Sequence, residues 1–166
     1  MTSPLTKSPE FEMNPAHLCT EFEARRLVSV AFDLIRQRYV VERHQIASAI
    51  LAADGRIIVG LHSEAMVGRF SVCAETAALS SAILCGASPV AIAAVRYPKP
   101  SEEGPARIVA PCGACRELLL DYAPDIGVVI QRGDSAGLIP VSQEFPDKYR
   151  GTKWGVAPDP YAWSAP

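Results

Sequence analysis

Apolar residues recur at helical spacing early in the chain. The face that they share comprises Leu27, Val30, Ala31, Leu34 and Ile35. Thr20 precedes this face and Glu23 follows three residues later, which is the capping-box pattern that begins a helix. Residues 1–19 carry three prolines and no periodicity, so we expect a flexible N-terminal tail there, with Met13 as an alternative start of the protein.

The next segments alternate between strand and helix patterns. Two apolar stretches within residues 45–62 flank Asp54-Gly55, a pair that accepts positive φ and so predicts a hairpin. Residues 73–85 are rich in Ala and Leu and stop at Gly86, which is typical of a helix. Another helix is predicted at residues 113–122, and strands are predicted at residues 90–95, 107–110, 127–131 and 137–141. Helices that alternate with strands favour an α/β fold, with a mixed sheet and helices on both of its faces.

Composition and charge narrow the classes of function. The chain has 166 residues, enough for one domain, which we expect at residues 20–166 with a C-terminal extension from Glu144. A net charge of −2 argues against binding of a nucleic acid polymer, which needs an excess of basic residues. No apolar run approaches the roughly 20 residues of a membrane span. The N-terminus lacks the charged-then-apolar order of a secretory signal, so we expect a cytoplasmic protein.

Cysteines carry the candidate chemistry. The chain has five, and in a reducing compartment spaced cysteines indicate metal binding or catalysis rather than disulfides. Two motifs stand out because each is expected to open a helix: Cys73-Ala74-Glu75 and Pro111-Cys112-Gly113-Ala114-Cys115. Zinc accepts thiolate sulfur and prefers four ligands, so Cys73, Cys112 and Cys115 would hold Zn²⁺ and leave the fourth position for water.

Alternatively, these cysteines are structural or redox-active, because a cysteine on an apolar helix usually belongs to the core. The joint pattern of the two motifs favours zinc. Cys19 and Cys85 have no such neighbours in the sequence. We expect Cys85 in the core and Cys19 as a thiol of the tail.

Glu75 lies two residues after the first predicted ligand and is not needed as a fourth one. A carboxylate there can take a proton from zinc-bound water and return it to a ring nitrogen or a leaving amine. Helix starts offer unpaired N–H groups that favour thiolate over thiol. Arg116, next to the last ligand, is a candidate for neutralising the charge of three thiolates. This combination is typical of zinc deaminases.

These residues resemble a known family, the small homotetrameric cytidine deaminases and the related blasticidin S deaminases. The resemblance covers residues 20–149 and is carried by Asp54-Gly55, Gly60, Glu64, Cys73-Ala74-Glu75 and Pro111-Cys112-Gly113-x-Cys115-Arg116. It implies a three-layer α/β/α sandwich around a mixed five-stranded sheet. It also implies a homotetramer, with a dimer as the alternative.

The resemblance further implies a substrate pocket. Glu64 matches the carboxylate that binds a ribose hydroxyl in cytidine deaminases, and Ala74 would place a backbone group near the substrate amine. Tyr149, at the end of the segment 145–149, matches a C-terminal aromatic residue that closes the pocket of a neighbouring subunit.

Three positions depart from the family pattern. His62 stands where the family usually has Asn, and His44 stands where it often has an aromatic residue. Both are candidate substrate contacts, with ordinary strand-end histidines as the alternative. Thr76 stands where the family often has an Arg that offsets the charge of the thiolates. Arg116 is therefore the stronger candidate for that role in this chain. The sequences of the stretches that begin at Ile46 and Asp54 resemble the blasticidin S deaminases more than the cytidine deaminases.

The sequence thus predicts hydrolytic removal of the exocyclic amine of cytidine, deoxycytidine or a closely related cytosine nucleoside, with release of ammonia. Alternatives with the same chemistry are a nucleoside antibiotic such as blasticidin S and another aminated heterocycle. Editing of polymeric nucleic acid is disfavoured because phosphate binding needs clustered Lys and Arg. A zinc module without catalysis would need a fourth protein ligand and has no use for Glu75. Cleavage of a glycosidic bond is a further alternative.

Overall fold

The computed structural model describes residues 10–13 and 19–149, without the side chains of the first four. The helices are α1 (Glu21–Arg38), α2 (Ala74–Leu84), α3 (Gly113–Tyr122) and α4 (Val141–Glu144), with a short 3-10 helix at Gly68–Phe70. The strands are β1 (Glu10–Met13), β2 (Ile46–Ala52), β3 (Ile57–Leu61), β4 (Pro89–Arg96), β5 (Arg107–Ile108), β6 (Gly127–Arg132) and β7 (Ser135–Pro140). The C-terminal extension beyond Tyr149 lies outside the described residues.

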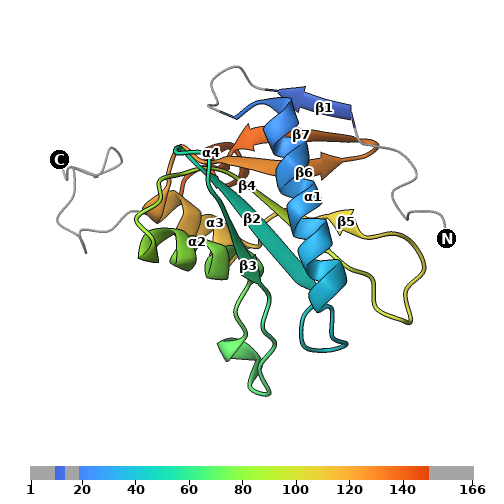
Figure 1. The fold of residues 1–166 in the computed structure, drawn as a ribbon. Coiled ribbons are helices and arrows are strands. Elements are labelled where there is room, and N and C mark those ends of the chain that lie inside the picture. Colours follow the sequence, from blue (N-terminus) through green and yellow to red (C-terminus); the bar gives the residue numbers. More distant parts are fainter. Residues whose placement is uncertain (1–9, 14–18, 150–166) are drawn as a thin grey trace, which may run out of the picture.

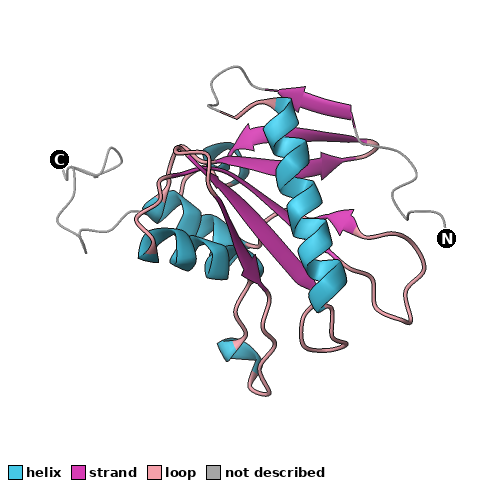
Figure 2. Ribbon diagram, in the orientation of Figure 1, coloured by secondary structure: helices cyan, strands magenta, loops and turns pink. Residues whose placement is uncertain are grey.

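The strands form one mixed sheet in the order β1-β7-β6-β4-β2-β3, with β5 paired to β4 (Figure 1). β2 runs antiparallel to both β3 and β4, and β4 runs parallel to β6. Strands β3, β4 and β6 therefore share one direction. Figure 2 shows helices on both sides of the sheet. The predicted three-layer α/β/α sandwich is confirmed. β5 corresponds to the strand predicted at residues 107–110 and is shorter than expected, and β1 is an additional strand.

Each face of the sheet carries its own apolar core. The core beneath α1 includes Leu27, Ala31, Ile35, Ala47, Ala49 and Val95. The core beneath α2 and α3 includes Ile50, Ala78, Leu79, Ile92, Leu119 and Val128. Successive residues of β2 and β4 thus alternate between the two cores, as the period of two in a strand requires.

Two local predictions are confirmed by their geometry. Thr20 caps α1: its side chain accepts from the backbone N–H of Glu23, and the Glu23 carboxylate accepts from the backbone N–H of Thr20. β2 and β3 pair as a hairpin in which Gly55 has φ 82°, a conformation that glycine adopts without steric cost. No helix of the described residues is long and apolar enough to cross a bilayer.

The predictions for the two remaining cysteines are wrong. Cys19 is 2% exposed and belongs to the core beneath α1, because it directly precedes the cap of that helix. Cys85 is exposed, because it ends α2 at the surface. The tail also differs from expectation at Glu10–Met13, which form β1 and pair with β7.

The start of α2 lies against β3 at a position that has no side chain. A Cβ atom added to Gly60 would overlap the carbonyl oxygen of Ala74 and the amide nitrogen of Ala78. Both atoms are backbone, so they cannot move without moving the first turn of α2. Gly60 therefore sets the distance between β3 and the helix that begins with the motif Cys73-Ala74-Glu75.

Substitution of Gly60 by Ala should destabilise the protein by about 3 kcal/mol, the upper part of the usual cost of overpacking. Urea unfolding monitored by circular dichroism measures this. Gly68→Ala is the matched control, because a Cβ at Gly68 would meet nothing within 4 Å. Equal free energies of unfolding for the two variants would contradict the close approach.

Candidate metal centre and active site

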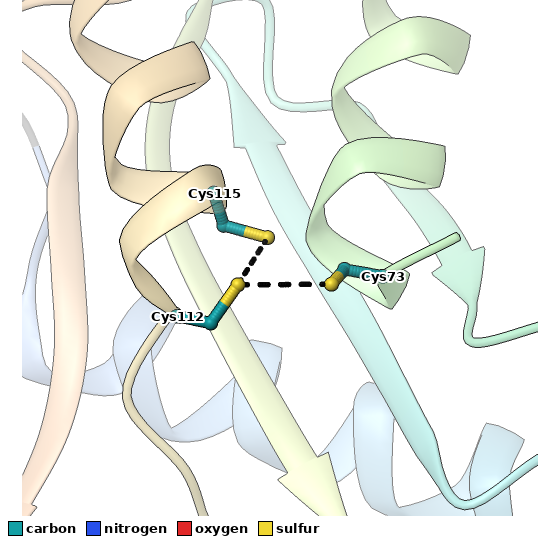
Figure 3. Close-up of side chains that lie close together, drawn as sticks. All are labelled: Cys73, Cys112 and Cys115. Atoms are coloured by element: carbon teal, nitrogen blue, oxygen red, sulfur yellow. Dashed lines mark hydrogen bonds between the residues drawn. The ribbon is translucent and has the colours of Figure 1, made fainter. Parts of the chain in front are cut away.

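Three cysteine sulfurs converge where α2 and α3 begin (Figure 3). Cys73 is the N-cap of α2, Cys112 is the N-cap of α3, and Cys115 lies in the first turn of α3. The Sγ atoms of Cys73 and Cys112 are 3.7 Å apart, and those of Cys112 and Cys115 are 3.6 Å apart. All three sulfurs lie within 4.8 Å of one another.

These distances fit a tetrahedral zinc ion. A Zn–S bond of about 2.3 Å at the tetrahedral angle separates two sulfurs by about 3.8 Å. Within the described residues, no fourth His, Cys, Asp or Glu belongs to the cluster. Three protein ligands and one remaining position are the arrangement of catalytic rather than structural zinc.

The helix start favours one of the thiolates even in the metal-free protein. Burial opposes ionisation of Cys112, but hydrogen bonds from the backbone N–H of Cys115 and from the neighbouring thiols hold its pKa below the usual value. Burial raises the pKa of Cys73 and of Cys115, and the charge of Glu75 adds to both effects. A divalent cation between the sulfurs reverses this balance, because a coordinated thiol loses its proton.

Backbone pairing holds the first ligand in place. Ser63 and Val72 exchange two hydrogen bonds, from the Ser63 N–H to the Val72 carbonyl at 3.0 Å and from the Val72 N–H to the Ser63 carbonyl at 2.9 Å. The residue before Cys73 is thus tied to the segment that follows β3. His62 and Glu64 flank Ser63, so the same pairing places both residues next to the segment that leads into α2.

Glu75 is buried beside the sulfurs. It is the second residue of α2, its exposed fraction is 5%, and burial raises the pKa of its carboxyl group. A raised pKa suits a carboxyl group that acts in general acid–base catalysis.

Thr76 has a contact that the sequence did not reveal. Its Oγ1 lies 3.6 Å from the Sγ of Cys115. A metal-bound thiolate has no proton and can only accept, so the Thr76 hydroxyl is the donor in the metal-loaded protein. From the sequence this position shows only the loss of an Arg, because a long-range contact between two helix starts leaves no pattern along the chain.

Arg116 is engaged away from the sulfurs. Its Nε donates to the carbonyl of Pro111 at 2.9 Å, and its Nη1 donates to the carbonyl of Glu144 at 2.9 Å. Its Nη2 also lies 3.3 Å from the Glu144 carboxylate. Arg116 therefore ties the start of α3 to the end of α4, and its role in charge compensation stays a prediction.

His44, His62 and Glu64 are brought together by the structure. His44 Nδ1 lies 2.8 Å from the carbonyl oxygen of His62, which can only accept, so the proton is on Nδ1. His62 Nε2 lies 3.4 Å from the Glu64 carboxylate. Ser71, which the sequence did not single out, donates its hydroxyl to Glu64 and accepts from the Ala65 N–H at 3.1 Å. The Ser71 hydrogen bond holds the pKa of Glu64 below its usual value, so this carboxylate is ionised at neutral pH.

The last two candidates, Ala74 and Tyr149, occupy opposite environments. Ala74 is buried as the first residue of α2, and its carbonyl oxygen lies against Gly60. Tyr149 is 82% exposed. Neither placement tests a substrate contact, so both roles stay predictions.

Three converging thiols with one free coordination position, together with a buried carboxyl group two residues after the first ligand, define the site of a zinc-dependent deaminase. Comparison with known proteins agrees with this class. Residues 22–130 match the model of the cytidine and deoxycytidylate deaminase zinc-binding region, and the chain belongs to this family. The predicted enzyme class and zinc cofactor are confirmed.

Relatives and solved structures give a consistent picture. The chain is 40% identical over 125 residues to a blasticidin-S deaminase of Bacillus cereus, covering 74% of this chain and 89% of that protein. It is 34% identical over 104 residues to a cytidine deaminase of Halalkalibacterium halodurans, covering 61% and 74% of the two chains. The crystal structure of a cytidine deaminase from Bacillus anthracis superposes with a TM-score of 0.64 at 23% identity, covering 75% of this chain and 88% of that one. This likeness shows the fold alone.

We expect the purified protein to contain about one zinc ion per chain, the stoichiometry of a single three-thiolate site. Serine at position 73, 112 or 115 should remove most of this zinc, because the cation then loses a thiolate. Elemental analysis after dialysis measures the content. Cys85→Ser is the control, since Cys85 is an exposed cysteine outside the cluster. Full zinc content in the Cys112→Ser protein would contradict the site.

Proposed function

We propose that this enzyme hydrolyses the exocyclic amine of cytidine, deoxycytidine or a closely related cytosine nucleoside and releases ammonia. The observation that carries the proposal is the buried Glu75 carboxyl group beside three converging cysteine sulfurs. Zinc, when bound by Cys73, Cys112 and Cys115, supplies Lewis-acid activation of water.

Glu75 moves the protons of this reaction. Its carboxylate takes a proton from the attacking water and delivers it to the ring nitrogen next to the reacting carbon. The hydroxyl that the water leaves on the reacting carbon gives up the second proton, which Glu75 carries to the exocyclic nitrogen. The C–N bond then breaks, ammonia leaves, and the water oxygen becomes the new carbonyl. The buried position of Glu75 supports this role, because desolvation raises the pKa of its carboxyl group and a raised pKa suits a group that takes up and returns a proton.

The cluster beyond β3 serves as the sugar end of the pocket in this proposal. The Glu64 side chain is ionised and 43% exposed, so it can accept from a substrate hydroxyl while it keeps its contacts to Ser71 and His62. His44 keeps its Nδ1 proton for the His62 carbonyl, which leaves Nε2 as an acceptor. Ala74 contributes a backbone group at the amine.

A second candidate is deamination of a nucleoside antibiotic of the blasticidin S type. The relative that acts on blasticidin S is 40% identical and is covered over 89% of its length. Histidines at positions 44 and 62 change the pocket in shape and charge from the Asn and aromatic residue of the usual pattern. The substrate in either case is a small molecule.

The enzyme works as a homotetramer in this proposal, with a dimer as the alternative, and Tyr149 closes the pocket of a neighbouring copy. Large apolar side chains are exposed between β3 and α2, which supports association: Met66, Val67, Phe70 and Val72. Light scattering on the purified chain tests this, and a monomer at micromolar concentration would contradict it.

The reducing cytoplasm suits a site that needs free thiolates, and we place the enzyme there. Turnover of cytidine would assign it to pyrimidine salvage. Fractionation of the source cells tests the compartment, and recovery outside the cytosolic fraction would contradict it.

Replacement of Glu75 by Gln should leave the zinc content unchanged and lower turnover by about 10²- to 10⁴-fold, the usual contribution of a general acid–base residue. Ammonia release is measured over cytidine, deoxycytidine, CMP, blasticidin S, cytosine and guanine. Glu103→Gln is the control, because Glu103 is an exposed loop carboxylate. If the zinc-loaded protein released no ammonia from any of these compounds, the proposed function would be contradicted. Full activity of E75Q would show that Glu75 does not transfer the protons.

Substitution of Glu64 by Ala should raise KM about tenfold for substrates with a ribose hydroxyl, because a charged acceptor is lost. Cytosine, which has no sugar, should be affected within about twofold by the same argument. Steady-state kinetics on cytidine and cytosine measure the difference. An equal effect on both would show that Glu64 does not contact the sugar.

A further inference from the structure

The chain after α4 returns to α3 and is held there by a lysine. Lys148 Nζ lies 2.7 Å from Glu117 Oε1 and 2.9 Å from Asp121 Oδ1. Glu117 and Asp121 are four residues apart on α3, so both face the same side of that helix. The Lys148 side chain is only 9% exposed, although lysine is among the residues most often found in solvent.

This pairing differs from a mobile surface ion pair. The hydrogen bond to Glu117 raises the pKa of Lys148, together with the bond and charge of Asp121, while desolvation opposes them. A covered ammonium group with two carboxylate partners is charge-satisfied, and loss of one side would leave uncompensated charge. The preceding residue, Asp147, has φ 56°, a conformation that residues with a side chain rarely adopt. The backbone therefore adopts a disfavoured conformation at the residue before Lys148.

The helix that receives Lys148 is also the helix that carries two zinc ligands. Glu117 follows Cys115 by two residues, and Arg116 between them is bound to Glu144. The segment 144–149 is therefore attached to α3 at two points close to the metal centre. Tyr149 directly follows Lys148, and within its own chain this residue is 82% exposed.

We infer that Lys148 is a positioning residue: its ion pairs with Glu117 and Asp121 fix the Tyr149 ring for the substrate pocket of a neighbouring copy. This inference rests on the proposed function, because it assigns the ring to that pocket. Lys148 itself touches no substrate. Its loss should weaken substrate binding and leave the metal centre and the chemical step in place.

Limited proteolysis tests the ion pairs without reference to activity. Trypsin cleaves after lysine, so cleavage at Lys148 in the zinc-loaded full chain reports how freely this residue leaves α3. The double variant E117Q/D121N should release the fragment that ends at Lys148 about tenfold faster, because local opening governs cleavage. D125N/D134N is the matched control, since it removes two exposed carboxylates beyond α3. Equal rates in the two variants would overturn the attachment.

Kinetics test the positioning role. Lys148→Met keeps the length of the side chain without its charge, and it should raise KM about tenfold with kcat within twofold and zinc content unchanged, the result expected from lost orientation of a binding group. Lys148→Arg keeps the charge and should restore most of the lost affinity. E117Q/D121N should show the same rise in KM, which gives a second route if the Lys148→Met protein does not fold.

The outcomes separate this inference from the proposed function. Unchanged KM in K148M and in E117Q/D121N would overturn the positioning role, and equal loss of kcat and zinc would assign Lys148 to the stability of α3 instead. Failure of the unmodified enzyme to release ammonia from every compound would contradict the proposed function and with it the assignment of Tyr149 to a pocket. The proteolysis result would still decide whether Lys148 holds the segment to α3.

Discussion

Two helix starts must meet within one zinc coordination sphere, and the rest of the structure follows from that constraint. Strands β3 and β4 run in the same direction, and α2 follows β3. β4 is followed by β5, which pairs antiparallel with the end of β4 before α3 begins. Contact between the first turn of α2 and β3 requires Gly60, and the pairing of Ser63 with Val72 fixes the residue before Cys73. Packing of both helices on one apolar core then brings the sulfurs to 3.7 Å and 3.6 Å.

Charge at this centre is balanced by groups of several kinds. Three thiolates exceed the charge of Zn²⁺, and the sequence suggested Arg116 as the compensating cation. The guanidinium of Arg116 binds Glu144 and the Pro111 carbonyl, and its role in charge compensation stays a prediction. The backbone N–H groups at the start of α3 and the Thr76 hydroxyl lie beside the sulfurs. These neutral donors belong to the helices that carry the cysteines, so they would orient the thiolates and offset part of their charge without a long cationic side chain.

Sequence reasoning succeeded where a feature depends on neighbours along the chain. The cap at Thr20, the turn at Gly55 and the two cysteine motifs are local patterns, and the structure contains all of them. It failed for Cys19 and Cys85, because burial depends on which core lies beside a helix end. The contact of Ser71 with Glu64 was missed because it depends on the local pairing of Ser63 with Val72, and the contact of Lys148 was missed because it depends on how the chain after α4 returns to α3.

The residues that follow β3 hold one carboxylate in place through several side-chain contacts. Glu64 already accepts from Ser71 and lies near His62, so its orientation is fixed before a substrate arrives. His62 Nδ1 is buried and, among the described residues, has no hydrogen-bond partner. His62 Nε2 lies near the Glu64 carboxylate, which can only accept, so the tautomer with its proton on Nε2 fits this contact. An amide in place of His62 would offer a donor and an acceptor on a shorter side chain. The imidazole therefore directs its proton at the carboxylate and adds to the contacts that hold Glu64 in place.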